Sequence, residues 1–235
     1  MLRVESGTLV VHILKSHAIN NSMVNRDLQV KDMHELKLDE LGKIIEKEEP
    51  EGVEFYLMAD EKPYKGIESH RAAILFAIHL INENEKQDIK KAEELFGKEY
   101  ADQLHLFTCD ISKAEAKSLD PGELLFVPKV LCKDYYGNKK YDSDWVPNDE
   151  NFGKEVPYWY AFLEPPHGTK YGPEDLRRVN AVLFPDGADG LEAYEWTTDW
   201  SDVFDAGHEW WGASCWSVYD SHRDRFVVLL ASATD

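Results

Sequence analysis

Residues 209–233 of the chain have the sequence EWWGASCWSVYDSHRDRFVVLLASA, and this stretch decides much of the expected fold. Two runs rich in aromatic and apolar residues, Glu209–Tyr219 and Arg225–Ala233, flank the polar segment Asp220–Asp224. Strand-forming runs around a short polar segment predict a β-hairpin, here with a five-residue loop. Because Phe226–Ala231 is apolar at every position, we expect the second strand to lie inside a sheet rather than at its edge.

The N-terminal half alternates runs of two kinds. Runs of apolar and β-branched residues predict strands, and they occupy Thr8–Leu14, Val53–Met58 and Leu104–Ile111. Apolar residues at helical spacing predict helices, and these occupy Asp32–Glu48, Ser69–Asn84 and Asp88–Gln103. The middle of the second helix, Ala72–Ile81, is apolar nearly all round, so we expect it to be buried.

The C-terminal half contains further strand-like runs, at Leu124–Tyr136 and Val156–Glu164, on either side of a long polar loop over residues 133–156. Pro173 stands where the first helical residue is expected, and the helix it starts should end near Phe184, before Pro185 and Gly187. A shorter helix is predicted between the N-cap Asp199 and the stop at Gly207.

This order of elements predicts a mixed α+β fold. An N-terminal part of alternating strands and helices, residues 1–118, precedes a more β-rich part, residues 119–235, that ends in the hairpin. Pro121 and Gly122 suggest a boundary within Ser112–Glu123, although a single domain over residues 1–235 fits the length equally well.

Composition narrows the classes of function. The chain has 235 residues, of which 43% are hydrophobic, and a net charge of −19. Such a charge repels nucleic-acid backbones and anionic membranes, and it attracts basic partners. The longest apolar run, Ala72–Ile81, is too short to span a bilayer. Three cysteines without a CxxC pair favour a reducing cytoplasm over a secreted disulfide framework.

An acidic and aromatic segment, residues 186–211, is the strongest anomaly. The last 63 residues carry 13 acidic and 4 basic side chains, and five of the seven tryptophans lie between Trp196 and Trp216. In this segment carboxylates recur every three or four residues without any lysine or arginine among them. The pattern fits a binding surface, a catalytic pair of carboxylates, or solvated acids around tryptophans that fill the core.

Motifs for common chemistries are absent from the sequence. There is no phosphate-binding loop, dinucleotide-binding turn, zinc helix or nucleophile elbow, and we predict neither a cofactor nor a metal site. Ser214 stands in the fragment nearest to an elbow, and Asp186–Gly190 fits an ordinary turn better than a calcium loop. Cys215 with His208 could form a nucleophile and base, but a buried strand cysteine is the more common situation.

Two functions remain, beside a third interpretation in which the sequence assigns no function. The first is a non-enzymatic interaction module that binds a basic protein partner; its composition resembles, without any matched motif, that of small bacterial inhibitor or immunity proteins. The expected binding residues are Asp199, Trp200, Asp202, Asp205, Glu209, Trp210 and Trp211. The second is a carboxylate-dependent hydrolase, with carbohydrate as a possible substrate. Its candidate catalytic residues are Glu195, Asp199, His208 and Glu209.

Overall fold

The computed structural model describes residues 32–37, 52–135, 137–147, 156–166, 168–208 and 212–232. Its strands are β1 (Met33–Glu35), β2 (Glu54–Asp60), β3 (Ala116–Leu119), β4 (Val130–Lys133), β5 (Lys139–Tyr141), β6 (Leu191–Trp196), β7 (Ser214–Asp220) and β8 (Arg225–Ala231). Its helices are α2 (Ile67–Phe96), α3 (Lys98–Ala101), α4 (Pro121–Leu124), α5 (Tyr158–Leu163), α6 (Pro173–Leu183) and α7 (Asp205–His208), with 3-10 turns η1 (Ile111–Lys113) and η2 (Asp202–Phe204). The mixed α+β class, with a strand-rich C-terminal part ending in a hairpin, is confirmed.

The central sheet has the strand order β1-β2-β8-β7-β6-β3, and every neighbouring pair in it is antiparallel. The predicted hairpin is formed by β7 and β8, with Asp220 opposite Arg225, so the loop is one residue shorter than expected. The strand β8 lies between β2 and β7, which confirms that the Phe226–Ala231 run is internal to the sheet.

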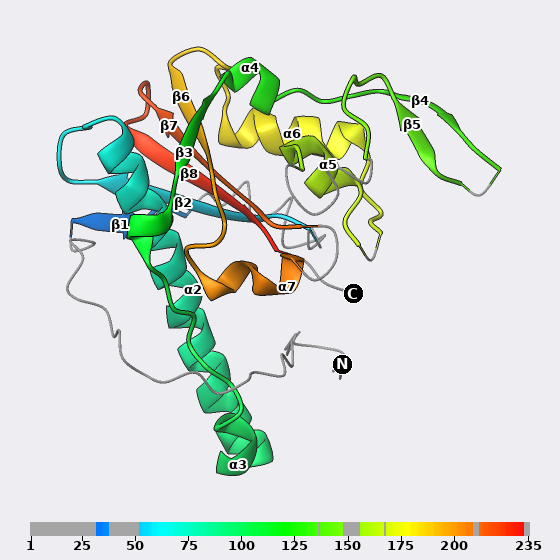
Figure 1. The fold of residues 1–235 in the computed structure, drawn as a ribbon. Helices are drawn as coiled ribbons and strands as arrows, with labels where there is room; N and C mark the ends of the chain where they lie inside the picture. Colours follow the sequence, from blue (N-terminus) through cyan, green and yellow to red (C-terminus); the bar gives the residue numbers. More distant parts are fainter. Residues whose placement is uncertain are drawn as a thin grey trace.

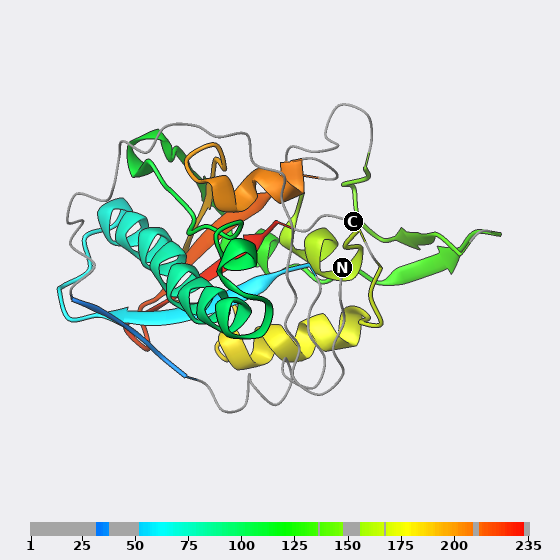
Figure 2. The same cartoon turned by 90° about the horizontal axis from the view of Figure 1, so that it is seen from below.

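Helices cover both faces of the sheet (Figures 1 and 2). The N-terminal half of α2 packs on one face, where Ile74 and Ile78 contact Met58 and Val228 in one apolar cluster. The helices α5 and α6 pack on the other face, where a second cluster contains Leu229. This sheet takes strands from both sides of the boundary predicted at residues 118 and 119, and the division into two parts stays a prediction.

The long helix α2 corrects the prediction of two helices, Ser69–Asn84 and Asp88–Gln103. It runs without interruption until Gly97, whose φ of 87° favours glycine and ends the helix. Its second half extends beyond the sheet (Figure 1), which explains why that half is polar. Among the described residues, no helix combines the length and apolar character needed to cross a membrane.

Other predictions are corrected in their type of structure. Met33–Glu35, inside the predicted helix Asp32–Glu48, is the edge strand β1. Leu104–Ile111 forms no named strand: both amide atoms of Asn82 pair with the backbone of Phe107, at 2.8 and 2.9 Å, and Cys109 makes an isolated bridge to Ser201. The predicted strand Val156–Glu164 contains helix α5 instead.

The remaining predictions are met in different degrees. Helix Pro173–Leu183 and strand Glu54–Asp60 agree closely with their predicted ranges. The Leu124–Tyr136 run contains only the short strand β4, and strands β3 and β6 were not predicted. The predicted strand Thr8–Leu14 lies outside the described residues.

Removing side-chain volume from the middle of the sheet should destabilise the whole fold. Leu229 is fully buried on β8, so we expect Leu229→Ala to lower the free energy of unfolding by about 2–5 kcal/mol. Leu95 on α2 is 70% exposed, and Leu95→Ala should change it by no more than about 0.5 kcal/mol. Urea unfolding followed by tryptophan fluorescence measures both; equal effects would contradict the central position of β8.

Candidate functional site

The chain that follows β6 carries most of the predicted site residues. Asp199 and Asp205 are exposed, on the turn before η2 and at the start of α7. Asp202 is half-buried, and its carboxylate accepts hydrogen bonds from the backbone N–H and the hydroxyl of Thr108, at 2.7 and 2.8 Å. These three predicted acids thus share one short stretch of the chain, and Asp202 ties that stretch to the segment of Thr108.

That second segment contributes a further carboxylate, which sequence reasoning missed. Asp110 N–H donates to the carbonyl oxygen of Trp200 at 2.6 Å, so Asp110 lies beside the predicted acids. A hydrogen bond from the Ser112 hydroxyl lowers the pKa of Asp110. We define the acidic surface as Asp110, Asp199, Asp202 and Asp205. No sequence signal connects Asp110 with the others, because their contact depends on how distant segments pair.

The acidic surface has a cysteine at its inner edge. Cys109 is half-buried and bridges Ser201 across the two segments. Burial raises the pKa of its thiol, and the negative charges of Asp202 and Asp110 raise it further. Because a thiolate is disfavoured here, the cysteine is not an activated nucleophile.

The tryptophans of the segment do not line this surface where they are described. Trp200 is 1% exposed and packs edge-on against Phe204, with ring centroids 5.4 Å apart. Trp200 therefore belongs to the core and corrects the prediction that it contacts a partner. Glu209, Trp210 and Trp211 lie outside the described residues.

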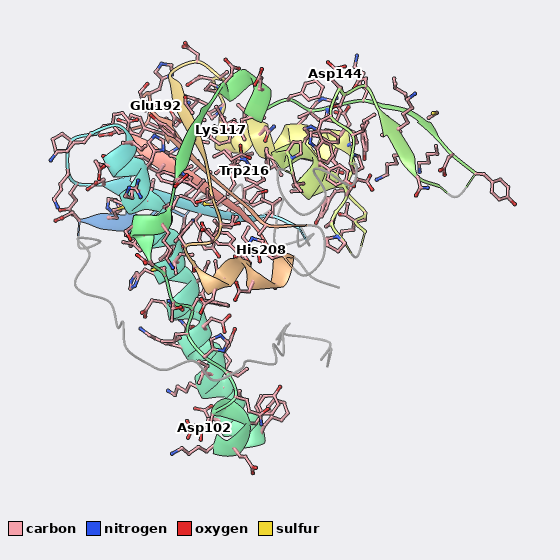
Figure 3. All side chains as sticks on the ribbon, viewed as in Figure 1. Asp102, Lys117, Asp144, Glu192, His208 and Trp216 are labelled. Carbon is pink, nitrogen blue, oxygen red and sulfur yellow. The ribbon has the colours of Figure 1, made fainter. Side chains whose placement is uncertain are left out.

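The structure brings His208 next to the segment that carries Asp199 and leaves Glu195 on β6. Glu195 forms an ion pair with Lys117 on β3, at 3.4 Å. His208 ends α7, and its Nε2 lies 2.7 Å from the hydroxyl oxygen of Thr198. Figure 3 shows Lys117 on β3 and His208 on α7, beyond the end of β6. Among the described residues, no hydrogen bond or ion pair joins Glu195 to His208.

The two nucleophile candidates are structural. Ser214 is buried, and its hydroxyl donates to the carbonyl oxygen of Val156 at 3.3 Å. Cys215 has no exposed surface, and burial raises the pKa of its thiol well above the ordinary value. The interpretation of Cys215 as a small apolar core residue is the one that the structure supports.

The predicted turn at Asp186–Gly190 is present and is bound to the hairpin loop. Arg223 Nη1 donates to Asp186 at 2.7 Å. This hydrogen bond has the largest effect in lowering the pKa of the Asp186 carboxyl, and the hydrogen bond of His222 lowers it further. Arg223 also pairs with the buried Asp220 at 3.1 Å. The Asp186 carboxylate, at this end of the segment, is therefore paired with a cation of the hairpin.

A chain of buried polar groups crosses the interface between α2 and the sheet. His70 on α2 is fully buried, with Nδ1 at 2.9 Å from the Ser217 hydroxyl oxygen and Nε2 at 3.1 Å from the Tyr64 hydroxyl oxygen. Ser217 also accepts a hydrogen bond from the indole N–H of Trp196, at 2.8 Å. Tyr64 in turn hydrogen-bonds to Glu192 on β6.

The direction of this chain follows from its last member. A carboxylate only accepts, so Tyr64 donates to Glu192 and its oxygen accepts from His70. We therefore assign the proton of the neutral imidazole to Nε2, and the Ser217 hydroxyl donates to Nδ1. Burial lowers the pKa of His70 to about 4, against a smaller opposite effect of Glu192. Because His70 and Ser217 are both fully buried, the pair satisfies core polar groups and does not meet a substrate.

Within the described residues, no group of three or more histidine, cysteine, aspartate or glutamate side chains is arranged to hold a metal ion. The chain matches no protein-family model, no curated protein and no solved structure. The site is therefore defined by its own geometry: three exposed carboxylates and the half-buried Asp202 on two adjoining segments, beside the buried rings of Trp200 and Phe204.

The buried His70 should make stability depend on pH. Its pKa is about 4 in the folded protein and about 6.5 in the unfolded chain, so the unfolded state binds a proton first as pH falls. We expect this residue to remove about 2 kcal/mol of stability between pH 7 and pH 5, a loss that starts near the unfolded pKa and is complete below pH 4. Urea unfolding of the wild type and of His70→Gln at both pH values isolates it; an equal pH dependence in both proteins would contradict it.

Proposed function

We propose that this protein is a non-enzymatic interaction module that binds a basic protein partner through the acidic surface. The observation that carries the proposal is the hydrogen-bonded pairing of the segment of Asp110 with the segment that carries Asp199, Asp202 and Asp205. Asp110 itself makes only a long ion pair with Lys113 among the described residues, at 3.9 Å. Crowded carboxylates repel one another, and a cationic partner relieves that repulsion.

The distribution of cations supports this choice of surface. Arg223 and Arg225 lie at the hairpin turn, where they pair with Asp186 and Asp220. No lysine occurs after Lys170. The acids of the turn are thus paired with arginines of this chain, and we propose that the acids around η2 and α7 meet the arginine and lysine side chains of another protein.

The fixed backbone around the acidic surface favours recognition. Ser201 donates from its hydroxyl to the carbonyl oxygen of Thr108 at 2.8 Å, and Trp200 anchors the turn from below. A rigid set of charges loses little conformational entropy on binding. Exposed carboxylates steer association and confer a strong salt dependence, and they contribute less to affinity than buried anchors do.

The hydrolase alternative receives less support, because Glu195 is paired with Lys117 and, among the described residues, no hydrogen bond or ion pair joins it to His208. We also propose a cytoplasmic location. Cys132 is an exposed free thiol, which suits a reducing compartment.

Affinity capture from a native lysate of the source cells, at low and moderate salt, tests the proposal. The captured protein, once identified and purified, should carry a net positive charge. The variant Asp199→Asn/Asp205→Asn should weaken its binding about tenfold in titration calorimetry, more strongly at low salt than at high salt. Asp202 is left intact in this variant because its carboxylate holds Thr108.

The matched control removes two exposed acids elsewhere. Asp102 lies at the far end of the long helix (Figure 3) and Glu99 lies in α3, and Glu99→Gln/Asp102→Asn makes the same change in net charge. Binding that falls equally in both variants, an acidic captured protein, or no capture at either salt concentration would each reject the proposed function.

A further inference from the structure

The strands β4 and β5 form a separate two-stranded sheet that projects from the body (Figures 1 and 2). We define the basic arm as residues 129–141. Neither strand pairs with the central sheet, so each keeps one free edge among the described residues. A two-stranded hairpin is only marginally stable alone in water. The arm therefore depends on contacts at its base, and a further strand on a free edge would stabilise it.

The contacts at the base of the arm are made by β5. Lys139 forms an ion pair with Glu164 at 2.9 Å, and the Tyr141 hydroxyl donates to the same carboxylate. The Tyr141 ring also packs on Trp159, with centroids 5.1 Å apart. Every residue of β4, by contrast, is exposed. The strand that remains open to another molecule is therefore β4.

The arm has the opposite charge to the rest of the protein. It contains four lysines and one aspartate, in a chain whose net charge is −19. The aspartate, Asp134, accepts hydrogen bonds within the turn from the backbone N–H and the side-chain amide of Asn138, both at 2.8 Å. Three of the lysines are exposed and have no ion pair among the described residues; they are Lys129, Lys133 and Lys140.

The order of side chains along β4 indicates the composition of a ligand. Lys129 and Lys133 flank the run of Val130, Leu131 and Cys132. Leu131 lies at a register shift between its two neighbours and is 59% exposed, and Val130 is 37% exposed. Cross-strand pairs of opposite charge or of apolar side chains each contribute about 0.2–1 kcal/mol. The complementary strand is therefore apolar in its middle and acidic at both ends.

Two other occupants of this edge fit less well. Antiparallel pairing of β4 with a second copy of itself would bring lysine opposite lysine, and edge lysines disfavour such pairing. A nucleic acid offers no strand that could pair with the backbone groups of the edge. Its long phosphate backbone is also repelled by a net charge of −19.

We propose that the basic arm binds an extended acidic segment of another protein, which adds as a third strand to the free edge of β4. Backbone hydrogen bonds along the edge supply affinity in this mode of binding, and the flanking lysines supply the preference for acidic ends. The arm and its ligand are separate from the acidic surface and its basic partner. The inference thus goes beyond the proposed function.

A synthetic peptide tests the inference. The probe is a fluorescently labelled peptide of sequence Glu-Glu-Val-Thr-Val-Glu-Glu with blocked ends, titrated with the full chain and followed by fluorescence anisotropy. We expect binding whose dissociation constant rises at least about tenfold between low salt and about 0.5 M salt. The arm variant Lys129→Glu/Lys133→Glu should weaken binding at low salt by a similar factor, because it places carboxylates opposite carboxylates.

Two controls separate strand pairing from general attraction of charge. The variant Lys90→Glu/Lys98→Glu makes the same change in net charge on exposed lysines of α2 and α3, and should bind the peptide as the wild type does. A peptide of the same sequence with methyl groups on alternate backbone nitrogens keeps its charge and loses donors for the edge. It should bind at least about tenfold more weakly. Circular dichroism confirms that each variant is folded.

Four outcomes would overturn the inference. They are no binding to the wild type at about 1 mM protein, equal binding to the arm variant, equal binding of the methylated peptide, and tighter binding of a single-stranded DNA oligonucleotide with the same net charge as the peptide. The variant Asp199→Asn/Asp205→Asn, which tests the proposed function, should bind the peptide at least as tightly as the wild type. Failure of one proposal is thereby distinguished from failure of the other.

Discussion

The burial of strand β8 on both faces is the constraint on which the rest of the structure depends. Successive side chains point to opposite faces of a sheet. Phe226, Val228 and Leu230 therefore join the apolar cluster beneath α2, and Val227 and Leu229 join the cluster beneath α5 and α6. Because both faces of β8 are apolar, both faces of the sheet have to be covered by other elements. The helices on each face meet that requirement.

The same two-sided requirement places the acidic surface. After β6 the chain leaves the sheet while Trp200 and Phe204 remain in the cluster beneath α2. Around these rings Asp199 and Asp205 are exposed, whereas Asp202 is half-buried and Ser201 is buried. The alternation of acids and aromatic rings in the sequence is thus a division between core and solvent, and the rings position the acids without sharing their surface.

Sequence reasoning succeeded where a pattern has one physical solution. A polar pentapeptide between apolar runs predicts a hairpin, and Pro173 with Gly187 delimits a helix. Sequence reasoning failed where a strand and a helix fit the same pattern of side chains equally well. The run Tyr158–Leu163 is aromatic and apolar throughout, so its period does not distinguish a buried strand from a buried helix, and the packing against the sheet decides for a helix.

The candidate site was partly predictable for the same reasons. The acids Asp199, Asp202 and Asp205 were expected from their spacing alone, whereas the burial of Trp200 depends on the tertiary fold. Asp110 could not be found, because only the pairing of its segment with Trp200 places it there. The strands β4 and β5 lie partly in the predicted polar loop, residues 133–156. They are too short for the alternation of side chains along a strand to be recognised in the sequence.

The amide of Asn82 has a consequence for how the molecule moves. By pairing with both the N–H and the carbonyl of Phe107, it provides what a neighbouring strand would provide, at a point where no strand exists. The Asn82 side chain on α2 satisfies both polar backbone groups of Phe107. We therefore expect the amide hydrogen of Phe107 to exchange slowly with solvent, although its backbone is irregular. The Asn82 side chain thereby ties the connection that carries Asp110 to the long helix α2.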